Sequence, residues 1–340
     1  MNVLYVIEVM KFNKLIEVLP LSMPVSILID PSNVCNFKCS FCPTGNVEMR
    51  RESKRPIGRM SYDLFKKIID DLVEFKSRIN VIKLYKDGEP LLNKNIYKMI
   101  SYAKKKNITD DLHITTNASL LNVENIANLI DSGIDSIKIS VEHVSNRGYK
   151  DITQISHTTY DDIYKNVSYL YKYKIKTNPN VKIHVKIEDT GLSKEEIQKF
   201  ISNFTPISDT LSVDHLMGWG STGAQDLTLG VNSDKQTNGL HKLNKEKIVC
   251  PTIFYSLAIS FNGDVSPCCI DWNHSLKLGN VNDNTLLEIW NGKLVQEFRL
   301  NQLTGKRKLY DLCKTCDYLD SRPSSVDLDL YRDDLIDIYS

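Results

Sequence analysis

The periodicity of apolar and polar residues changes repeatedly between residues 25 and 216. Short apolar runs predict strands, and the longer segments between them place apolar residues on one helical face, as in 62–75 behind the N-capping Ser61. The pattern predicts strands at 25–29, 81–85, 111–116, 137–141, 181–187 and 211–216, and helices at 62–75, 96–106, 123–132, 160–173 and 193–204. Such alternation gives a parallel sheet with right-handed crossovers. Six units are too few for a closed eight-stranded barrel, so this α/β pattern predicts a partial barrel or an open doubly wound sheet.

The pattern is different on both sides of this region. Residues 1–22 predict a short lead-in, a strand or hairpin, and residues 48–59 a surface loop. Residues 218–249 have little periodicity and predict a linker. After it, two apolar runs flank Asn262-Gly263, which predicts a hairpin with a two-residue turn, followed by a helix at 285–303 and an acidic surface tail, in part disordered. The expected divisions are 1–22, 23–225, 226–320 and 321–340.

The composition excludes several classes of partner. The formal net charge of the 340 residues is +1, so no overall attraction to nucleic acid or to an anionic membrane is expected. No apolar stretch reaches the length of a membrane span, and Glu8 interrupts the run at 3–9. We therefore expect a soluble, cytoplasmic protein. Its eight cysteines indicate metal binding rather than disulfides, because the cytosol keeps thiols reduced.

The first cysteine group directly follows the first predicted strand. Cys35, Cys39 and Cys42 have the spacing C-x3-C-x2-C, with Phe41 before the last of them. Four thiolates saturate a cubic iron–sulfur cluster, so three leave one iron open to a small molecule. A zinc site would need a fourth ligand, and no His lies within the motif. Buried structural thiols are the other alternative.

This motif resembles the signature of the radical S-adenosylmethionine (SAM) superfamily. The resemblance implies a 4Fe–4S cluster held by the three cysteines, SAM bound to the open iron, and a partial (β/α)6 barrel. In a parallel sheet ligands bind at the carboxyl ends of the strands, and the cysteine loop lies at that end.

Further candidate SAM-binding residues follow later strands. Gly88 and Glu89 resemble the Gly-Gly-Glu element that holds the methionine amino group in this family, although Asp87 stands where the first Gly is usual. By itself the segment is also typical of a charged surface turn. Two other candidates, Thr116 and Asn117, end the third predicted strand. Ser140 and Glu142 end the fourth, and by order they match the position where the family hydrogen-bonds the ribose and the methionine carboxylate region.

The second cysteine group lies in the last third of the chain. Cys250, Cys268, Cys313 and Cys316 can supply four thiolates, for a second cluster or for a zinc ribbon. The pattern C-x12-G-x4-C followed by C-x2-C resembles the Twitch form of the SPASM auxiliary domain, and among Twitch enzymes the 2-deoxy-scyllo-inosamine dehydrogenases. Cys269 is left over. If it lies on a strand with Cys268, it faces away from whatever Cys268 faces.

The resemblance implies a radical enzyme with two 4Fe–4S clusters and SAM. We expect it to take a hydrogen atom from a small-molecule substrate, sugar-like or aminocyclitol-like, and to dehydrogenate a secondary alcohol with the second cluster as electron acceptor. Flavodoxin or ferredoxin would supply the electron. The alternatives are an epimerase that uses Cys269 as hydrogen donor, a peptide-modifying enzyme, and a non-catalytic iron–sulfur electron-transfer or zinc-binding protein.

Overall fold

The fold is built on a single open sheet. The computed structural model describes residues 13–216, 219, 227–231, 246–314 and 316–340. The order of the nine strands is β6-β5-β4-β3-β2-β1-β7-β8-β9, so β6 and β9 form the edges. The first six strands are parallel neighbours in chain order. They are β1 (Ser26–Ile29), β2 (Ile79–Leu84), β3 (Thr109–Thr116), β4 (Ser136–Val141), β5 (Lys182–Asp189) and β6 (Thr210–His215). The predicted partial (β/α)6 barrel is confirmed.

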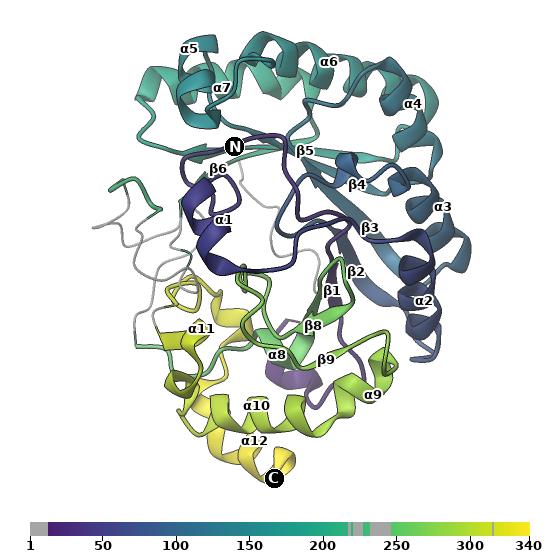
Figure 1. Cartoon of the computed structure of the whole chain (residues 1–340), viewed down its shortest axis with the longest axis vertical. Coiled ribbons are helices and arrows are strands. Elements are labelled where there is room, and N and C mark those ends of the chain that lie inside the picture. The colour runs from purple at the N-terminus through teal and green to yellow at the C-terminus, as the bar shows by residue number, and fades with distance from the viewer. Residues whose placement is uncertain (1–12, 217–218, 220–226, 232–245, 315) are drawn as a thin grey trace.

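Helices cover the outer face of these strands (Figure 1). Ser61 caps the first of them as predicted, since its Oγ accepts a hydrogen bond from the Leu64 amide at 3.1 Å. Apolar side chains such as Ile82, Ile114 and Ile139 are fully buried between sheet and helices. The helices are α2 (Tyr62–Val73), α3 (Ile96–Lys106), α4 (Val123–Asp131), α6 (Tyr160–Thr177) and α7 (Lys194–Phe204).

The inner face of the sheet is polar. Successive strand side chains point to opposite faces, so the residues between the buried aliphatic ones face inward. In the sheet register Lys83 lies opposite His113, and Lys138 lies opposite both Thr115 and His184. A parallel strand buried on both faces would carry a nearly continuous apolar run. These strands alternate instead, and their inner face has the polar side chains that a ligand site needs.

The sheet continues into the auxiliary part of the chain. After α8 (Thr252–Tyr255), strand β7 (Ser256–Ile259) pairs in parallel with β1, and β8 (Asp264–Ser266) and β9 (Gly279–Asn280) follow antiparallel. The predicted two-residue turn is wrong. The Ser260 amide donates to the Asp264 carbonyl at 2.8 Å, which leaves a three-residue loop that ends at Gly263 with φ +91°.

Several local predictions are corrected. The lead-in contains η1 (Leu15–Val18) rather than a strand, while residues 1–12 lie outside the described residues. The expected surface loop at 48–59 begins with α1 (Val47–Ser53). The helix expected at 285–303 is two helices, α9 (Leu286–Asn291) and α10 (Lys293–Leu303), because Gly292 between them has an extended backbone. An unpredicted helix, α5 (Asn146–Thr153), follows β4. The linker predicted at 218–249 lies largely outside the described residues.

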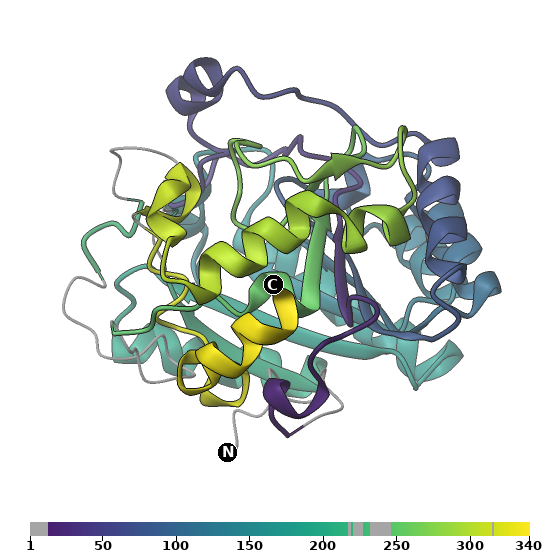
Figure 2. The ribbon, with the colours of Figure 1, turned by 90° about the horizontal axis from the view of Figure 1, so that it is seen from below.

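The prediction of a partly disordered acidic tail is wrong. The tail forms η6 (Ser324–Val326), η7 (Asp329–Tyr331) and α12 (Arg332–Tyr339), and α12 lies beside α10 (Figure 2). Leu328 and Leu335 are buried, and the Arg332 guanidinium donates to the Leu303 carbonyl at 2.7 Å. The prediction failed because it relied on the acidic composition of the tail and not on the spacing of its leucines. No helix among the described residues is long and apolar enough to cross a membrane.

Candidate active site

The first cysteine group lies in the loop between β1 and α1, at the carboxyl end of β1. Burial raises the pKa of Cys35 to about 12, and the neighbouring Glu89, Cys42 and Glu142 add to this. Cys39 is shifted in the same direction by burial and by Glu142, Cys42 and Cys35. The three thiols therefore lie close together. Because burial and the neighbouring acidic groups disfavour their thiolate forms, a nearby positive charge is needed to stabilise those forms. Bound iron ions supply that charge, so the chemistry of the group fits a cluster.

Close backbone packing fixes this loop. A Cβ on Gly88 would lie 2.4 Å from the Ser32 carbonyl oxygen and 2.5 Å from that of Val34, so only glycine fits there. The next residue, Glu89, donates its amide to the Val34 carbonyl at 2.9 Å. The segment 87–89 thus lies directly against the cysteine loop, as the resemblance implies.

Glu89 is the centre of a buried hydrogen-bond network. One carboxylate oxygen accepts from the Thr116 hydroxyl at 2.7 Å and from the Leu91 amide at 3.0 Å; the other accepts from the Asn117 amide at 2.8 Å. The Asn117 side chain in turn donates to Asn36 in the cysteine loop at 3.0 Å. Burial raises the pKa of Glu89 to about 7, against the effect of these donors. The structure therefore brings Glu89 together with Thr116 and Asn117, which lie 27 and 28 positions later in the sequence.

Two more predicted residues lie at the carboxyl end of β4. Glu142 is buried, and its Oε2 has no hydrogen-bond partner among the described residues. It acts electrostatically on all three cysteines, and burial raises its own pKa to about 7. Ser140 lies opposite Lys186 on the inner face. An unpartnered buried carboxylate beside the cysteine loop is an acceptor that a bound ligand can satisfy.

The second cysteine group also converges. Burial raises the pKa of Cys313 and of Cys316 to about 12, and the Cys250 thiol adds to both shifts. The pKa of Cys268 is raised by its hydrogen bond with Cys269 and by burial, and Cys250 and Cys316 add to this. The four thiols are therefore neighbours, although 66 positions of sequence separate Cys250 from Cys316. Across the described residues, no three Cys, His, Asp or Glu side chains are placed to hold a single metal ion. A cubane cluster needs a wider spacing because each thiolate binds a different iron.

The prediction that Cys269 faces away from Cys268 is corrected. Strand β8 ends at Ser266, so neither cysteine lies on a strand and side-chain alternation does not apply. The two thiols are hydrogen-bonded to each other, and Cys269 Sγ lies 3.6 Å from the Tyr318 hydroxyl. Cys269 also acts electrostatically on Lys83 and Tyr85 of the inner face. It is therefore a neighbour of Cys268 and Tyr318, and it lies close enough to Lys83 and Tyr85 to act on their charge.

A buried ionic network joins the two parts of the site and was missed in the sequence. Asp87 lies 3.1 Å from Arg55 and from His274, and 2.6 Å from Lys86. Arg55 also donates to the Trp272 carbonyl at 3.0 Å and packs over the indole ring at 4.1 Å. The sequence offered one signal for this network: Asp87 replaces the first Gly of the Gly-Gly-Glu pattern.

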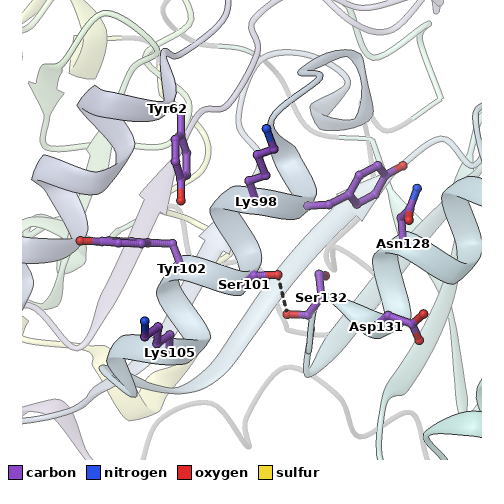
Figure 3. Close-up of a pocket in the computed structure, with 9 residues that line it drawn as sticks. Tyr62, Lys98, Ser101, Tyr102, Lys105, Asn128, Asp131 and Ser132 are labelled. Atoms are coloured by element: carbon purple, nitrogen blue, oxygen red, sulfur yellow. Dashed lines mark hydrogen bonds between the residues drawn. The ribbon is translucent and has the colours of Figure 1, made fainter.

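A separate hollow lies on the outer surface. It measures about 510 Å³, between α2, α3 and α4, and Figure 3 shows Tyr62, Lys98, Tyr102 and Asp131 around it. These helices cover the outer face of the sheet, so the hollow is separated from both cysteine groups by the sheet itself (Figure 1). None of the predicted site residues lines it.

Comparison with known families identifies the first part of this site. The radical SAM superfamily matches residues 29–201, about half of the chain and the region with the three-cysteine loop. The chain belongs to the radical SAM superfamily. The iron–sulfur cluster-binding domain called SPASM matches residues 250–317, which contain the second cysteine group. A 4Fe–4S cluster and SAM are therefore cofactors of this radical SAM enzyme, and its SPASM domain binds further iron–sulfur.

Related proteins have similar length but low identity. The tungsten-containing aldehyde ferredoxin oxidoreductase cofactor-modifying protein of Pyrococcus furiosus is 21% identical, over 87% of this chain and 88% of the relative. The S-adenosyl-L-methionine-dependent 2-deoxy-scyllo-inosamine dehydrogenase of Niallia circulans is 22% identical, over 85% of this chain and 91% of the relative. Streptococcus suis SuiB, solved with its precursor peptide SuiA, shares the fold at a TM-score of 0.63 and 17% identity, over 92% of this chain and 78% of SuiB.

Proposed function

We propose that this radical SAM enzyme dehydrogenates a secondary alcohol of a small sugar-like or aminocyclitol-like substrate. The observation that carries the proposal is the position of Cys269. It adjoins Cys268 of the second cysteine group and acts on Lys83 and Tyr85 of the inner face, where a substrate would lie. A cluster at the second group would then be close enough to accept an electron from that substrate.

The described residues divide into three groups in this proposal. Cys35, Cys39 and Cys42 hold the catalytic cluster. Glu89, in its network with Thr116 and Asn117, holds the methionine ammonium, and Gly88 lets the backbone approach. The remaining SAM-binding residues are Phe41, Ser140 and Glu142, and the second cluster is held by Cys250, Cys268, Cys313 and Cys316.

When bound, the first cluster and SAM supply a 5′-deoxyadenosyl radical, at the expense of one electron from a donor such as flavodoxin or ferredoxin. Removal of a hydrogen atom from the carbinol carbon, then of the hydroxyl proton, leaves one electron to dispose of. A cluster held by Cys250, Cys268, Cys313 and Cys316 would be the acceptor for that electron, and the product would be a ketone. The residues of the inner face position the carbon and exclude water.

Epimerisation is the second candidate, and one observation favours it. The thiol of Cys269 lies beside the inner face rather than turned away from it, so it is placed to return a hydrogen atom to a substrate radical. The peptide in the SuiB structure, which has a similar fold, motivates a third candidate, a peptide substrate.

The test compares the chemistry of these candidates. Anaerobically reconstituted wild-type protein and Cys269→Ala are incubated with SAM, a reductant and a panel of aminocyclitols that includes 2-deoxy-scyllo-inosamine, in deuterated water. We expect 5′-deoxyadenosine, a ketone product without deuterium at the attacked carbon, and substantial activity in Cys269→Ala. Deuterium at that carbon, with loss of turnover in the variant, would instead establish epimerisation. Turnover of peptides alone would reject the small-molecule substrate.

A further inference from the structure

The lysines of the inner face of the sheet are unequally paired with carboxylates. Lys186 is paired with Glu188 and lies 3.7 Å from Asp214. Within ion-pair distance, Lys138 has only that same Asp214 among the described residues, also at 3.7 Å. Lys83 has no carboxylate within ion-pair distance among the residues that the structure describes. Among the described residues, Lys186 thus has two carboxylates within ion-pair distance, Lys138 has one and Lys83 has none.

The surroundings of Lys83 increase this imbalance. Burial lowers its pKa; Arg322 and Lys138 act in the same direction, opposed by Cys269 and by Asp111. The Asp111 carboxylate accepts a hydrogen bond from the Ser136 hydroxyl at 2.7 Å, and burial raises its pKa. A half-buried cation that has lost water and has no direct ion pair is incompletely compensated, so an anion that enters here is stabilised.

The neutral groups between the lysines have no negative charge to offer. His113 lies on β3, between Lys83 on β2 and Lys138 on β4. Its ring nitrogens contact the hydroxyls of Ser136 at 2.9 Å and Thr115 at 3.1 Å. Burial and both lysines hold the pKa of His113 well below its usual range, so the ring is neutral.

We propose that the substrate of this enzyme carries an oxyanion, a phosphate or a carboxylate, which binds between Lys83 and Lys138 in front of His113. This inference rests on the proposed small-molecule function and names the chemical class of the substrate. The two lysines lie on strands two places apart, roughly 10 Å across the sheet. Lysine side chains are long enough to converge on one group from that separation. The anion anchors one end of the substrate, and the rest extends along the inner face toward the cysteines at the carboxyl ends of the strands.

The test measures anion binding separately from radical chemistry. Inorganic phosphate and acetate are titrated by calorimetry into the cluster-loaded, SAM-bound protein and into Lys83→Met and Lys138→Met. Methionine keeps much of the length of lysine and removes its charge. Lys172→Met, on the exposed surface of α6, is the matched control for loss of one positive charge. We expect each inner-face variant to weaken binding about tenfold or more, and Lys172→Met to bind like wild type. Tighter phosphate binding would indicate a phosphate ester, and tighter acetate binding a carboxylate.

Three outcomes would overturn the inference. They are no saturable binding of either anion to wild type up to about 10 mM, equal binding in wild type and both inner-face variants, and an equal loss in Lys172→Met. Circular dichroism on each variant separates a binding defect from misfolding. SAM cleavage is measured in parallel without added anion. Failure of wild-type cleavage would reject the proposed function, whereas failure of anion binding with normal cleavage would reject only the substrate class.

Discussion

The guanidinium of Arg55 lies 3.1 Å from the carboxylate of Asp87, and neither side chain has any solvent exposure. Burial alone would raise the pKa of Asp87, but Lys86, His274 and Arg55 together lower it. Lys86 also donates to the Asp271 carbonyl at 3.0 Å, and Arg55 to that of Trp272. The pair therefore connects the segments that follow α1 and β2 to residues 271–274 of the SPASM domain.

We expect Asp87→Asn to lower the free energy of unfolding by about 3 kcal/mol, because it leaves Arg55 and Lys86 buried beside a neutral amide. Urea unfolding followed by circular dichroism measures the change. Asp63→Asn is the control: Asp63 pairs with Lys66 on the surface of α2 and is 91% exposed, so its loss should cost less than about 1 kcal/mol. Equal effects of the two substitutions would contradict a structural role for the buried pair.

Glu89→Gln should weaken SAM binding about tenfold or more, the equivalent of about 1.5–3 kcal/mol for a charge-assisted hydrogen bond to the methionine ammonium. Equilibrium dialysis with cluster-loaded protein gives the affinity. Glu124→Gln, on the exposed side of α4, removes the same charge outside the site and should leave the affinity unchanged. If Glu89→Gln binds SAM as tightly as wild type, Glu89 has another role.

Replacement of Cys35, Cys39 and Cys42 together by Ala should reduce the iron content of the reconstituted protein from about eight to about four atoms per chain. SAM cleavage should be abolished, because the remaining cysteines belong to the second group. Iron analysis and chromatography of 5′-deoxyadenosine are the measurements. Retained cleavage in this triple variant would reject the catalytic assignment of the loop.

Glu142 should make the cluster-free protein less stable as the pH rises. Its pKa is about 7 in the folded protein against 4.5 unfolded, so the folded form holds the proton more tightly between these values. The contribution of protonated Glu142 to the free energy of unfolding is fully present below pH 4.5. It is lost as the pH rises through 7, which lowers the free energy of unfolding by about 3 kcal/mol. Urea unfolding of wild type and Glu142→Gln across this range should show curves that agree at the acid end and diverge toward neutral pH, with the variant more stable. Parallel curves would show that Glu142 is not the group that titrates.

The sequence by itself determined the strand–helix order and the cysteine loop. Side-chain periodicity is a local property, and it placed all six strands of the core and the helices between them within a few residues. The family motif named Gly88 and Glu89 because a glycine at a close backbone contact leaves a recognisable pattern. The alternating Lys, His and Ser residues of β2 to β5 were also present in the sequence, as a polar inner face that parallel strands do not usually show.

Only the tertiary structure decided which distant residues meet. Arg55 reaches Asp87 across 32 positions and Trp272 across 217, and no local pattern encodes such a contact. Cys268 and Cys269 do not point to opposite faces because β8 ends at Ser266, three residues before the end of the apolar run that predicted the strand. The acidic tail is ordered: Leu328 and Leu335 are buried, and α12 packs against α10. This packing depends on the presence of α10 and does not follow from the composition of the tail. Long-range packing and the ends of short strands depend on contacts with residues that are distant in the sequence. A local sequence pattern carries no information about those contacts.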